Sequence, residues 1–357
     1  MGTAAATAAK TVTSLSPKEK VERLRKLFKN RKRGLVLTHD NPDPDSMASA
    51  VALAAVLHSR LGIPTDVAYG GIIGRAENAA FVRVLKLPLV PISQIVTSRY
   101  DLFALVDTQQ SVKNHSLPEH INADIVIDHH PTRDDGVVNP FADLGSGSYG
   151  ATSTVLTEYL RAAHIEPDPE LATALYYGIK ADTRDLERQT RDPDVDCYLW
   201  LFPRIDRNLL AEIEHPRLPL RYFRLFHAAI EKARLFTGAV ITDLGEVYSP
   251  DMVAEVAERL SFLEEAKWSL ASGSYRGQLY LSLRCSDRRM NAGRLIREVC
   301  EGLGGSAGGH GSMAGARLPL TGKRANRVAF KREVVRRFKA AFGVEGERGV
   351  SPLSDDA

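Results

Sequence analysis

Short apolar runs alternate with helix-like segments through the first part of the chain. Runs of strand length occupy residues 34–38 (GLVLT), 65–71 (TDVAYGG), 100–108 (YDLFALVDT) and 123–131 (ADIVIDHHP). Short, continuous apolar runs are typical of strands that are buried on both faces of a parallel sheet. The pattern therefore predicts a sheet built from these segments.

Helical spacing of apolar residues fills the intervals between and after these runs. Residues 16–30 begin with a serine and an early acid, as helices do, and residues 46–62 end at a glycine. Residues 151–165 and 169–183 show the same spacing. Strands that alternate with helices predict an α/β domain with a doubly wound parallel sheet.

The pattern changes near residue 203. Residues 217–236 predict a connecting helix, and the strand-like runs that follow at 238–244 and 277–286 are separated by a helix at 252–263. We therefore predict a second, smaller α/β domain.

A glycine-rich segment at 304–316 and a basic amphipathic helix at 322–343 complete this second domain. By itself, the first is typical of a flexible linker and the second of a solvated helix face. The predicted regions are a disordered N-terminus (1–16), the first α/β domain (17–205), a helical linker (206–235), the second domain (236–340) and a loose tail (341–357).

The composition is that of an ordinary globular protein. Of the 357 residues, 44% are hydrophobic and 25% charged, and the net charge of +3 is too small to imply a nucleic-acid scaffold. The three cysteines have no CxxC spacing, which argues against a disulfide or zinc framework and favours a reducing compartment. With no apolar run long enough for a membrane span and no signal-peptide pattern, we expect a cytoplasmic protein without a membrane partner.

Polar residues of the metal-ligand type follow three of the predicted strands. Because the carboxyl ends of parallel strands share one edge of a sheet, these clusters converge there. An acid after the helical run at 169–183 could reach the same edge. The clusters are His39, Asp43 and Asp45; Asp107; Asp128, His129 and His130; and Asp182.

Carboxylates gathered in one crevice repel one another, and bound cations remove that repulsion. Histidines suit transition metals better than magnesium alone. Asp43 and Asp45 are two residues apart, so on an extended loop they would point in opposite directions, one toward each of two metals. Two ions about 3.5–4 Å apart lower the pKa of a shared water and clamp an in-line phosphoryl displacement.

Each piece has an ordinary interpretation as well. The segment NPDPD at 41–45 is by itself most often a turn, and Asp107 and Asp182 could cap helices. The ordered set on a strand–helix pattern favours the metal interpretation.

These segments resemble the motifs of the DHH phosphoesterase family. HDNPDPD, LVDT, IDHHP and GIKADT are similar to its four motifs in order, and GGSAGGHGSMAGA is similar to the GGH motif of its associated C-terminal domain. The resemblance covers residues 34–320 and is strongest to small RecJ-like members, namely nano-RNases and phosphatases of 3′,5′-bisphosphorylated adenosine (pAp). It implies a DHH catalytic domain joined by a helical linker to a substrate-binding domain, with the active-site cleft between them.

The resemblance also implies two divalent metal ions, with Mn²⁺ as the first choice and Mg²⁺ as the alternative. His39, Asp43 and Asp107 would hold one ion. Asp45, Asp107, His129 and Asp182 would hold the other, with Asp107 bridging the two.

The catalytic set implied by the resemblance is His130, Asp107 and Asp128. His130 would lie just outside the metal ligands and donate to the phosphoryl oxygens or the leaving group. Asp128 would orient a ligand histidine.

The second domain would bind the rest of the substrate. The family places a phosphate-binding arginine at Arg284, and the glycine-rich motif implies contacts from His310, Gly308, Gly309 and Ser312. Arg288 and Arg289 are looser candidates. The chain departs from small nano-RNases after the fourth motif, where Arg184 and Arg188 could change the charge of the pocket.

We therefore expect an enzyme in which a metal-activated hydroxide attacks phosphorus in short oligoribonucleotides, linear dinucleotides or pAp. One alternative is an inorganic pyrophosphatase or polyphosphatase. Another is a non-catalytic nucleotide sensor on the same fold. The expected partners are short RNA or nucleotides, and a homodimer is one of the oligomeric states left open.

Overall fold

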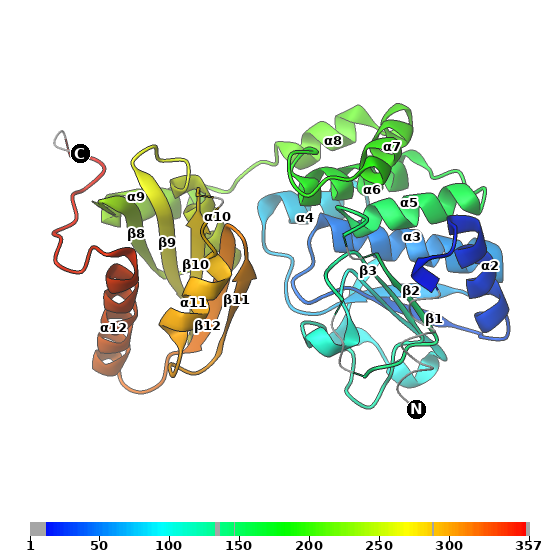
Figure 1. Ribbon diagram of the computed structural model, residues 1–357, viewed down its shortest axis with the longest axis horizontal. Helices are drawn as coiled ribbons and strands as arrows, with labels where there is room; N and C mark the ends of the chain where they lie inside the picture. The colour runs from blue at the N-terminus through cyan, green and yellow to red at the C-terminus, as the bar shows by residue number, and fades with distance from the viewer. Residues whose placement is uncertain (1–11, 133–135, 146, 288, 355–357) are drawn as a thin grey trace. The chain divides into compact units, whose positions relative to one another are not determined.

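The computed structural model describes residues 12–132, 136–145, 147–287 and 289–354, and only the backbone of His310. The chain divides between Pro216 and Arg217 into two compact units (Figure 1).

A six-stranded parallel sheet forms the centre of the N-terminal unit, in the order β3-β2-β1-β4-β5-β6. The strands are β1 (Gly34–Leu37), β2 (Thr65–Tyr69), β3 (Leu89–Pro91), β4 (Leu102–Val106), β5 (Ile125–Asp128) and β6 (Phe141–Leu144). Because the order changes direction at β1, a crevice opens beyond the ends of β1 and β4, where α/β proteins bind their ligands. The predicted parallel α/β sheet is confirmed.

Helices cover one face of this sheet. They are α2 (Pro17–Phe28), α3 (Pro44–Leu61), α4 (Ala76–Val84), α5 (Thr152–Ala162), α6 (Pro169–Thr183), α7 (Asp192–Leu201) and α8 (Arg207–Glu214). Val36 and Ile127 join one core with Leu53 of α3 and Val155 of α5. Leu35 and Val126 alternate to the second face and pack on residues of the short connecting segments. Both faces are therefore buried, which accounts for the continuous apolar runs.

The C-terminal unit has a mixed sheet in the order β11-β12-β10-β9-β8-β7, in which β8 and β9 pair in parallel and the other pairs are antiparallel. The strands are β7 (Arg234–Phe236), β8 (Gly238–Glu246), β9 (Ala266–Tyr275), β10 (Gln278–Cys285), β11 (Ser306–His310) and β12 (Met313–Pro319). This unit confirms the predicted second, smaller α/β domain.

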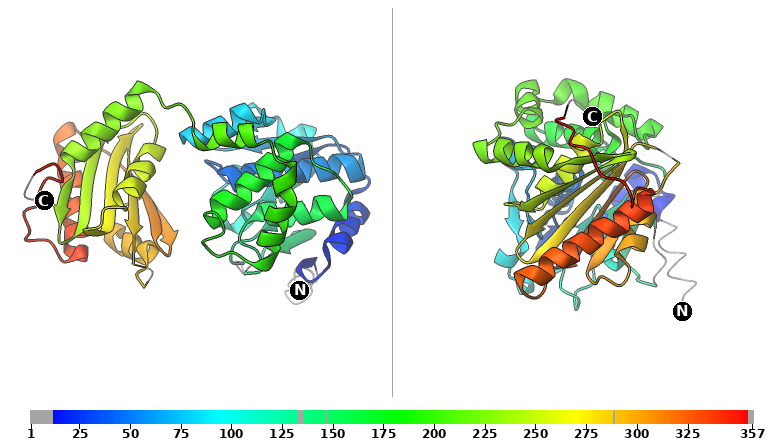
Figure 2. Two further views of the ribbon diagram at one scale, coloured as in Figure 1. Left: turned by 90° about the horizontal axis from the view of Figure 1, so that it is seen from above. Right: turned by 90° about the vertical axis from the view of Figure 1, so that its left-hand side faces the viewer.

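Helices pack on both faces of this mixed sheet. Those of one face are α9 (Leu220–Lys232) and α10 (Asp251–Leu260), and those of the other are α11 (Ala292–Cys300) and α12 (Arg324–Phe342). Figure 2 shows α12, in orange-red, lying across the strands.

The glycine-rich segment is not a linker but a hairpin of β11 and β12. Gly309 has φ 146°, and a Cβ atom there would lie 2.5 Å from the Cα atom of Ala314. Only glycine permits so close an approach of two strands. Strand packing therefore explains Gly309, and likewise Gly305, where a Cβ atom would lie 2.1 Å from the Arg317 carbonyl oxygen.

The prediction of loose ends is wrong for several residues. Val12 is buried in the first core, and the Thr13 hydroxyl accepts a hydrogen bond from the Leu144 backbone. Near the other end, Val344 is buried and Val350 pairs with Leu235 of β7. Apolar side chains with a place in a core anchor both segments. Residues 1–11 and 355–357 lie outside the described residues.

The predicted linker region, 206–235, contains two helices, α8 and α9, and the division between the units falls between them. None of the described helices is both long enough and apolar enough to cross a lipid bilayer.

Candidate metal centre

Seven of the predicted side chains meet at the carboxyl ends of β1, β4 and β5. One candidate ligand atom from each residue lies within 4.8 Å of the others in three overlapping groups. The groups are His39, Asp43 and Asp107; Asp45, His129 and Asp182; and Asp107, His129 and His130. Segments that are distant in sequence thus converge at the crevice where the strand order changes direction.

Asp107 lies between these groups. Its Oδ2 atom is 3.6 Å from His39 Nε2, and its Oδ1 atom is 3.5 Å from His129 Nε2. The Thr152 hydroxyl donates a 2.9 Å hydrogen bond to Oδ1. Asp107 also has φ 58°, a left-handed conformation that costs residues other than glycine about 1 kcal/mol or more and that is concentrated at functional sites. The carboxylate that follows β4 therefore faces His39 after β1 and His129 after β5, the strands on either side of β4.

The two aspartates of the first motif lie at the start of α3. Asp43 is its N-cap, with Oδ1 accepting a 3.0 Å bond from the Ser46 amide, and lies 3.7 Å from His39 Nε2. Asp45 is in the first turn and accepts bonds of 2.8 and 2.7 Å from the Thr152 and Ser153 amides. The extended loop predicted from the sequence is therefore wrong. The two acids still diverge, because an N-cap and the second helical residue point in different directions.

His129 supplies the observation that best fits a cation. Its Nδ1 atom is 3.4 Å from the Tyr149 carbonyl oxygen, which makes Nδ1 a donor, so in the neutral ring Nε2 carries the lone pair. Nε2 is buried, has no hydrogen-bond partner among the described residues and lies 3.1 Å from Asp182 Oδ2. A buried, unpartnered imidazole nitrogen among carboxylate oxygens is the donor set of a transition-metal site.

The charges of the cluster are unbalanced without cations. Burial raises the pKa of Asp107 well above its usual range, and the charge of Asp45 adds to this effect. Burial and the charge of Asp182 raise the pKa of Asp45 to about 6. Burial opposes protonation of His129, but the nearby carboxylate of Asp182 outweighs it and raises the pKa to about 9. The cluster therefore retains protons that a metal ion would displace.

Asp128 has a different neighbour from the one predicted. Its Oδ1 atom accepts a 2.8 Å bond from His130 Nδ1, and its Oδ2 atom accepts a 2.7 Å bond from Gln109 Nε2. Asp128 thus orients His130 rather than His129. The side chain of His130 is 45% exposed, so its other nitrogen can reach a ligand in the crevice.

Four residues that contribute to the site were missed from the sequence. Thr152 and Ser153 begin α5, and the serine–threonine pattern at a helix start was a usable signal. Gln109 gave no signal, because an amide after a strand is common. Gly178 of α6 lies where a Cβ atom would be 2.3 Å from Ser153 Oγ and 3.2 Å from Asp45 Cα. It therefore lets α6 approach the start of α3.

The segment after α6 has an unusual backbone. Arg184, Asp185 and Leu186 have positive φ angles in succession. Arg188 follows, half-buried, with an Nε atom that has no hydrogen-bond partner among the described residues. Burial lowers the pKa of Arg188, and the charge of Asp182 opposes this. Arg188, one of the two arginines predicted to change the charge of the pocket, thus lies close enough to the candidate ligand Asp182 to interact with its charge.

The predicted substrate residues lie in the C-terminal unit. Arg284 is the last residue but one of β10, and its Nη1 atom donates to Ser282 Oγ at 2.8 Å. Arg284 pairs with Met313 of β12 and shares its face of the sheet, and the backbone of His310 pairs with Met313 from the other side. Gly308, opposite Gly315, lies on the same face.

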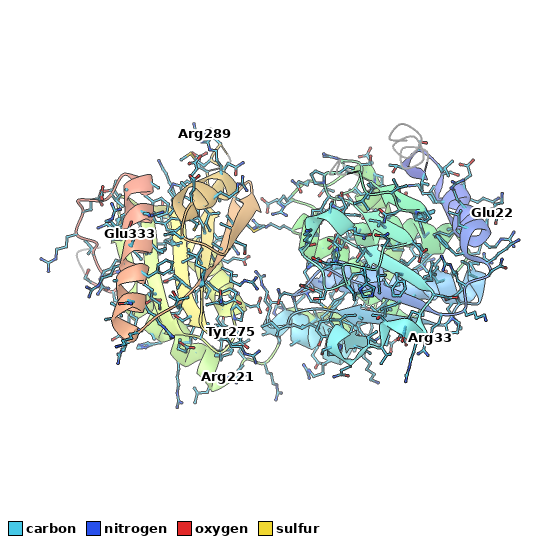
Figure 3. The ribbon with its side chains drawn as sticks, turned by 90° about the horizontal axis from the view of Figure 1, so that it is seen from below. Glu22, Arg33, Arg221, Tyr275, Arg289 and Glu333 are labelled. Carbon is cyan, nitrogen blue, oxygen red and sulfur yellow. The ribbon has the colours of Figure 1, made fainter. Side chains whose placement is uncertain are left out.

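Gly309 points to the other face, and the Ser312 carbonyl accepts a bond from the Cys285 amide. Arg289 projects from the turn after β10 with an 89% exposed side chain (Figure 3). Arg288 lies outside the described residues.

Fold and site together define an α/β protein whose sheet carries carboxylates and imidazoles with the chemistry of a metal centre. Residues 33–179 match the model of the DHH family, N-terminal domain, and residues 236–339 match that of the DHHA1 domain. The chain therefore belongs to the DHH family and carries a C-terminal DHHA1 domain, which confirms the resemblance that the motifs predicted.

Two curated proteins are similar to this chain in sequence. An uncharacterized protein of Methanocaldococcus jannaschii is 35% identical over 288 residues, which are 80% of this chain and 58% of that protein. A probable manganese-dependent inorganic pyrophosphatase of Deinococcus radiodurans is 28% identical over 169 residues, 47% of this chain and 52% of that protein. The chain thus spans little more than half the length of these curated relatives.

Two solved structures have the same fold at low identity. An exopolyphosphatase-related protein of Bacteroides fragilis superposes with a TM-score of 0.69 and 14% identity, covering 90% of this chain and 97% of that one. RecJ of Thermus thermophilus in complex with Mn²⁺ superposes with a TM-score of 0.53 and 18% identity, covering 92% of this chain and 55% of that one.

Proposed function

We propose that the protein is a metal-dependent phosphoesterase that hydrolyses short oligoribonucleotides, linear dinucleotides or pAp. The observation that carries this proposal is the position of Asp107, with one oxygen facing His39 and the other facing His129. A carboxylate shared between two groups of ligands is what a dinuclear phosphoesterase centre requires.

The residues would hold two divalent cations, Mn²⁺ by first choice. His39 and Asp43 would bind one ion, Asp45, His129 and Asp182 the other, and Asp107 both. When bound, such ions supply positive charge to a phosphoryl group and lower the pKa of water. The complex of Mn²⁺ with Thermus thermophilus RecJ, which has the same fold, supports this choice.

The protein's own groups would position the substrate. His130, held by Asp128, can donate from its second nitrogen to a phosphoryl oxygen or to the leaving group. Arg284 offers a planar guanidinium suited to a phosphate. We further propose that the C-terminal domain binds the nucleotide part of the substrate and that the protein acts in the cytoplasm.

A substrate panel tests the proposal. A dinucleotide, a five-residue RNA, a long RNA, pAp and pyrophosphate would each be incubated with manganese or magnesium. We expect release of mononucleotides from the short RNA, or of phosphate from pAp, with manganese. Asp107→Asn should lower the rate more than about 100-fold, because loss of a mere hydrogen-bond partner of a metal ligand already costs about 10- to 100-fold. Asp196→Asn, at a carboxylate with a 66% exposed side chain on α7, is the matched control.

A pyrophosphatase or polyphosphatase is the second candidate. Relatives described as manganese-dependent pyrophosphatases match 44–47% of this chain, which favours testing pyrophosphate in the same panel. Hydrolysis of pyrophosphate alone would establish this candidate and exclude the first. Nucleotide binding without turnover of any substrate in manganese would identify a sensor instead.

A further inference from the structure

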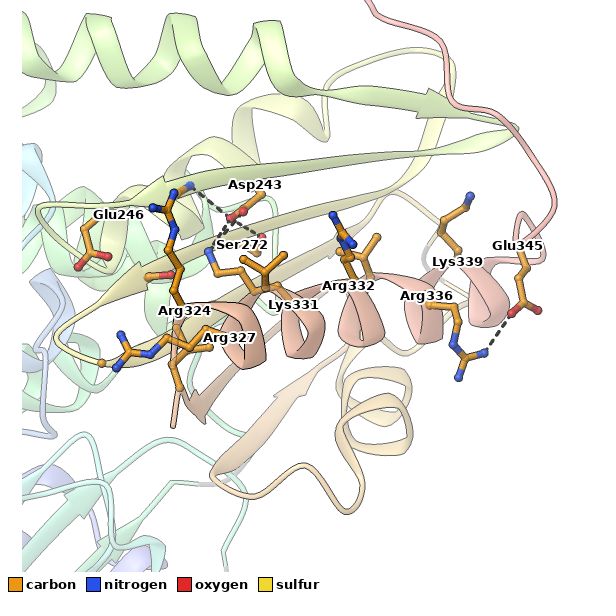
Figure 4. Close-up of a pocket in the computed structure, with 16 residues that line it drawn as sticks. Asp243, Glu246, Ser272, Arg324, Arg327, Lys331, Arg332, Arg336, Lys339 and Glu345 are labelled. Atoms are coloured by element: carbon orange, nitrogen blue, oxygen red, sulfur yellow. Dashed lines mark hydrogen bonds and ion pairs between the residues drawn. The ribbon is translucent and has the colours of Figure 1, made fainter. Parts of the chain in front are cut away.

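A groove runs between α12 and the C-terminal sheet (Figure 4). Its volume is about 830 Å³, within the range of small-molecule sites. Basic side chains of α12 form one wall, and residues of β8 and β9 form the other. The lining cations are Arg324, Arg327, Lys331, Arg332, Arg336 and Lys339.

The groove lies on the opposite face of the sheet from the predicted substrate residues. Asp243 of β8 pairs with Ser272 of β9, and Ser272 pairs with Leu281 of β10, so these three share a face. Arg284 is three residues beyond Leu281 on the same strand and therefore points to the other face. A ligand in the groove would thus be separate from one bound at Arg284.

Positive charge in the groove exceeds the negative charge available to it. The six cations face three lining carboxylates, those of Asp243, Glu246 and Glu345. Lys331 lies 3.3 Å from Asp243, and Arg336 lies 3.1 Å from Glu345 and 2.9 Å from Glu333, an acid of α12 outside the lining. Neither Arg324 nor Arg332 has a carboxylate partner among the described residues.

The sequence of α12 places like charges next to one another. Arg324 and Arg327 are three residues apart, and Arg327 and Lys331 are four apart, which are spacings at which helix side chains are neighbours and like charges destabilise. The first turn contains no acid, although negative charge is favoured there. An anion bound in the groove would relieve this repulsion.

We propose that the groove binds a nucleoside diphosphate or a similar small organic polyphosphate. The arginines of α12 would hold the phosphates. Val328, Val335 and Leu320 offer an apolar wall, and Glu246 and Ser272 offer acceptors for hydroxyl or amino groups. The carboxylate of Glu246 would repel a phosphate placed beside it, so a ligand that is anionic along its whole length fits less well. The lining also contains no aromatic side chain to stack the bases of a single strand.

The test uses adenosine 5′-(α,β-methylene)diphosphate, a nucleoside diphosphate that resists hydrolysis, with the full chain in manganese. Calorimetry should reveal a binding step that Arg324→Glu/Arg332→Glu weakens at least tenfold. Arg284→Ala should leave this step unchanged. Arg294→Glu, at an exposed arginine of α11 outside the groove, is the matched control. Circular dichroism of each variant establishes that it is folded.

Three outcomes would overturn the proposal. They are the absence of a step that depends on the α12 arginines, loss of all binding in Arg284→Ala, and equal binding of pyrophosphate without the nucleoside. Binding of a ten-residue RNA but not of the diphosphate would assign the groove to nucleic acid instead. The result is independent of the proposed hydrolysis, because the same variants can be assayed for turnover of a dinucleotide, which Arg324→Glu/Arg332→Glu should leave intact.

Discussion

At the scale of single residues, the candidate metal ligands could be predicted from the ends of the strands, whereas the residues that hydrogen-bond to them could not. His39, Asp107 and His129 could be predicted because a parallel sheet brings strand ends together. The sequence marked Thr152 as the start of a helix, but its contact with Asp107 could not be predicted, because the hydroxyl reaches Asp107 only through the packing of α5, 45 residues further along the chain. Asp128 was placed at the right edge, but the imidazole that it orients depends on side-chain torsions that a sequence does not specify.

The support that Thr152 gives to Asp107 leads to a prediction. Thr152→Val removes the 2.9 Å hydrogen bond while keeping the shape of the side chain. We expect manganese affinity to fall about 10- to 100-fold, as when other partners of metal ligands are lost. Titration of manganese binding by calorimetry measures the change.

Thr157→Val is the matched control on the same helix. Its buried hydroxyl donates to the Ser153 carbonyl oxygen and does not contact the cluster. Equal losses of manganese affinity in the two variants would show that Thr152 acts through helix stability alone.

At the scale of elements, regular apolar patterns located helices and strands well. The helix α6 has the predicted bounds, Pro169–Thr183. The strand β9 was missed because its small and polar residues, as in SLASGSY, hide the pattern of a strand that helices cover on both faces. The hairpin of β11 and β12 was missed because its glycines indicate a loop unless the neighbouring strand is known.

The contact between α6 and α3 predicts the effect of a methyl group. In an open helix, Gly→Ala stabilises by about 0.5–1 kcal/mol. Gly178→Ala should instead destabilise by about 1–3 kcal/mol, because its Cβ atom would lie 2.3 Å from Ser153 Oγ. It should also weaken manganese binding, since Asp45 lies beside it. Urea denaturation and calorimetry measure the two effects.

Gly178→Ala/Ser153→Ala should recover part of the lost stability, because the hydroxyl that clashes is gone. A single Gly178→Ala variant more stable than the parent would contradict the packing described.

A buried ion pair joins α2 to β6. Lys20 Nζ lies 2.9 Å from Asp143 Oδ2, which also accepts a bond from the Tyr159 hydroxyl. Lys20→Met leaves the carboxylate buried without its cation and should cost about 3–5 kcal/mol at neutral pH. Arg25→Met, at an exposed pair on the same helix, should change stability by less than about 0.5 kcal/mol.

The loss in Lys20→Met should depend on pH. Burial raises the pKa of Asp143, and the charge of Lys20 opposes this, so removing Lys20 raises the pKa further. A raised carboxyl pKa gives stability that is present below the unfolded-state pKa and lost as pH rises through the folded-state pKa. The deficit relative to the parent chain should therefore narrow as the solution is acidified. A deficit that is constant with pH would show that packing, not charge, is lost.

At the scale of the whole molecule, each unit has its own buried core, and the candidate ligands all belong to the first. The boundaries between regions were less predictable, because the helices α8 and α9 read as one linker although they belong to different units. A ligand that binds one folded unit stabilises that unit by mass action.

Labelling of the three buried cysteines can show when each of the two units unfolds. Cys197 lies in the first unit, and Cys285 and Cys300 in the second. Burial raises the pKa of Cys197 to about 12 and that of Cys300 to about 11, so both should react with thiol reagents only after unfolding. Manganese should raise the temperature at which Cys197 becomes labelled and leave the other two unchanged. Mass spectrometry of heated, labelled samples identifies each site, and equal shifts at all three cysteines would contradict independent unfolding.

The pairing of Val350 with Leu235 has a consequence for protein engineering. The C-terminal unit begins at Arg217, ahead of α9, and its last anchored residue returns to the edge strand β7. A unit moved into another protein must keep every segment that its core and its edge pairing use. A module cut from this chain should therefore run from Arg217 to at least Val350, rather than stop at residue 339, where the DHHA1 match ends.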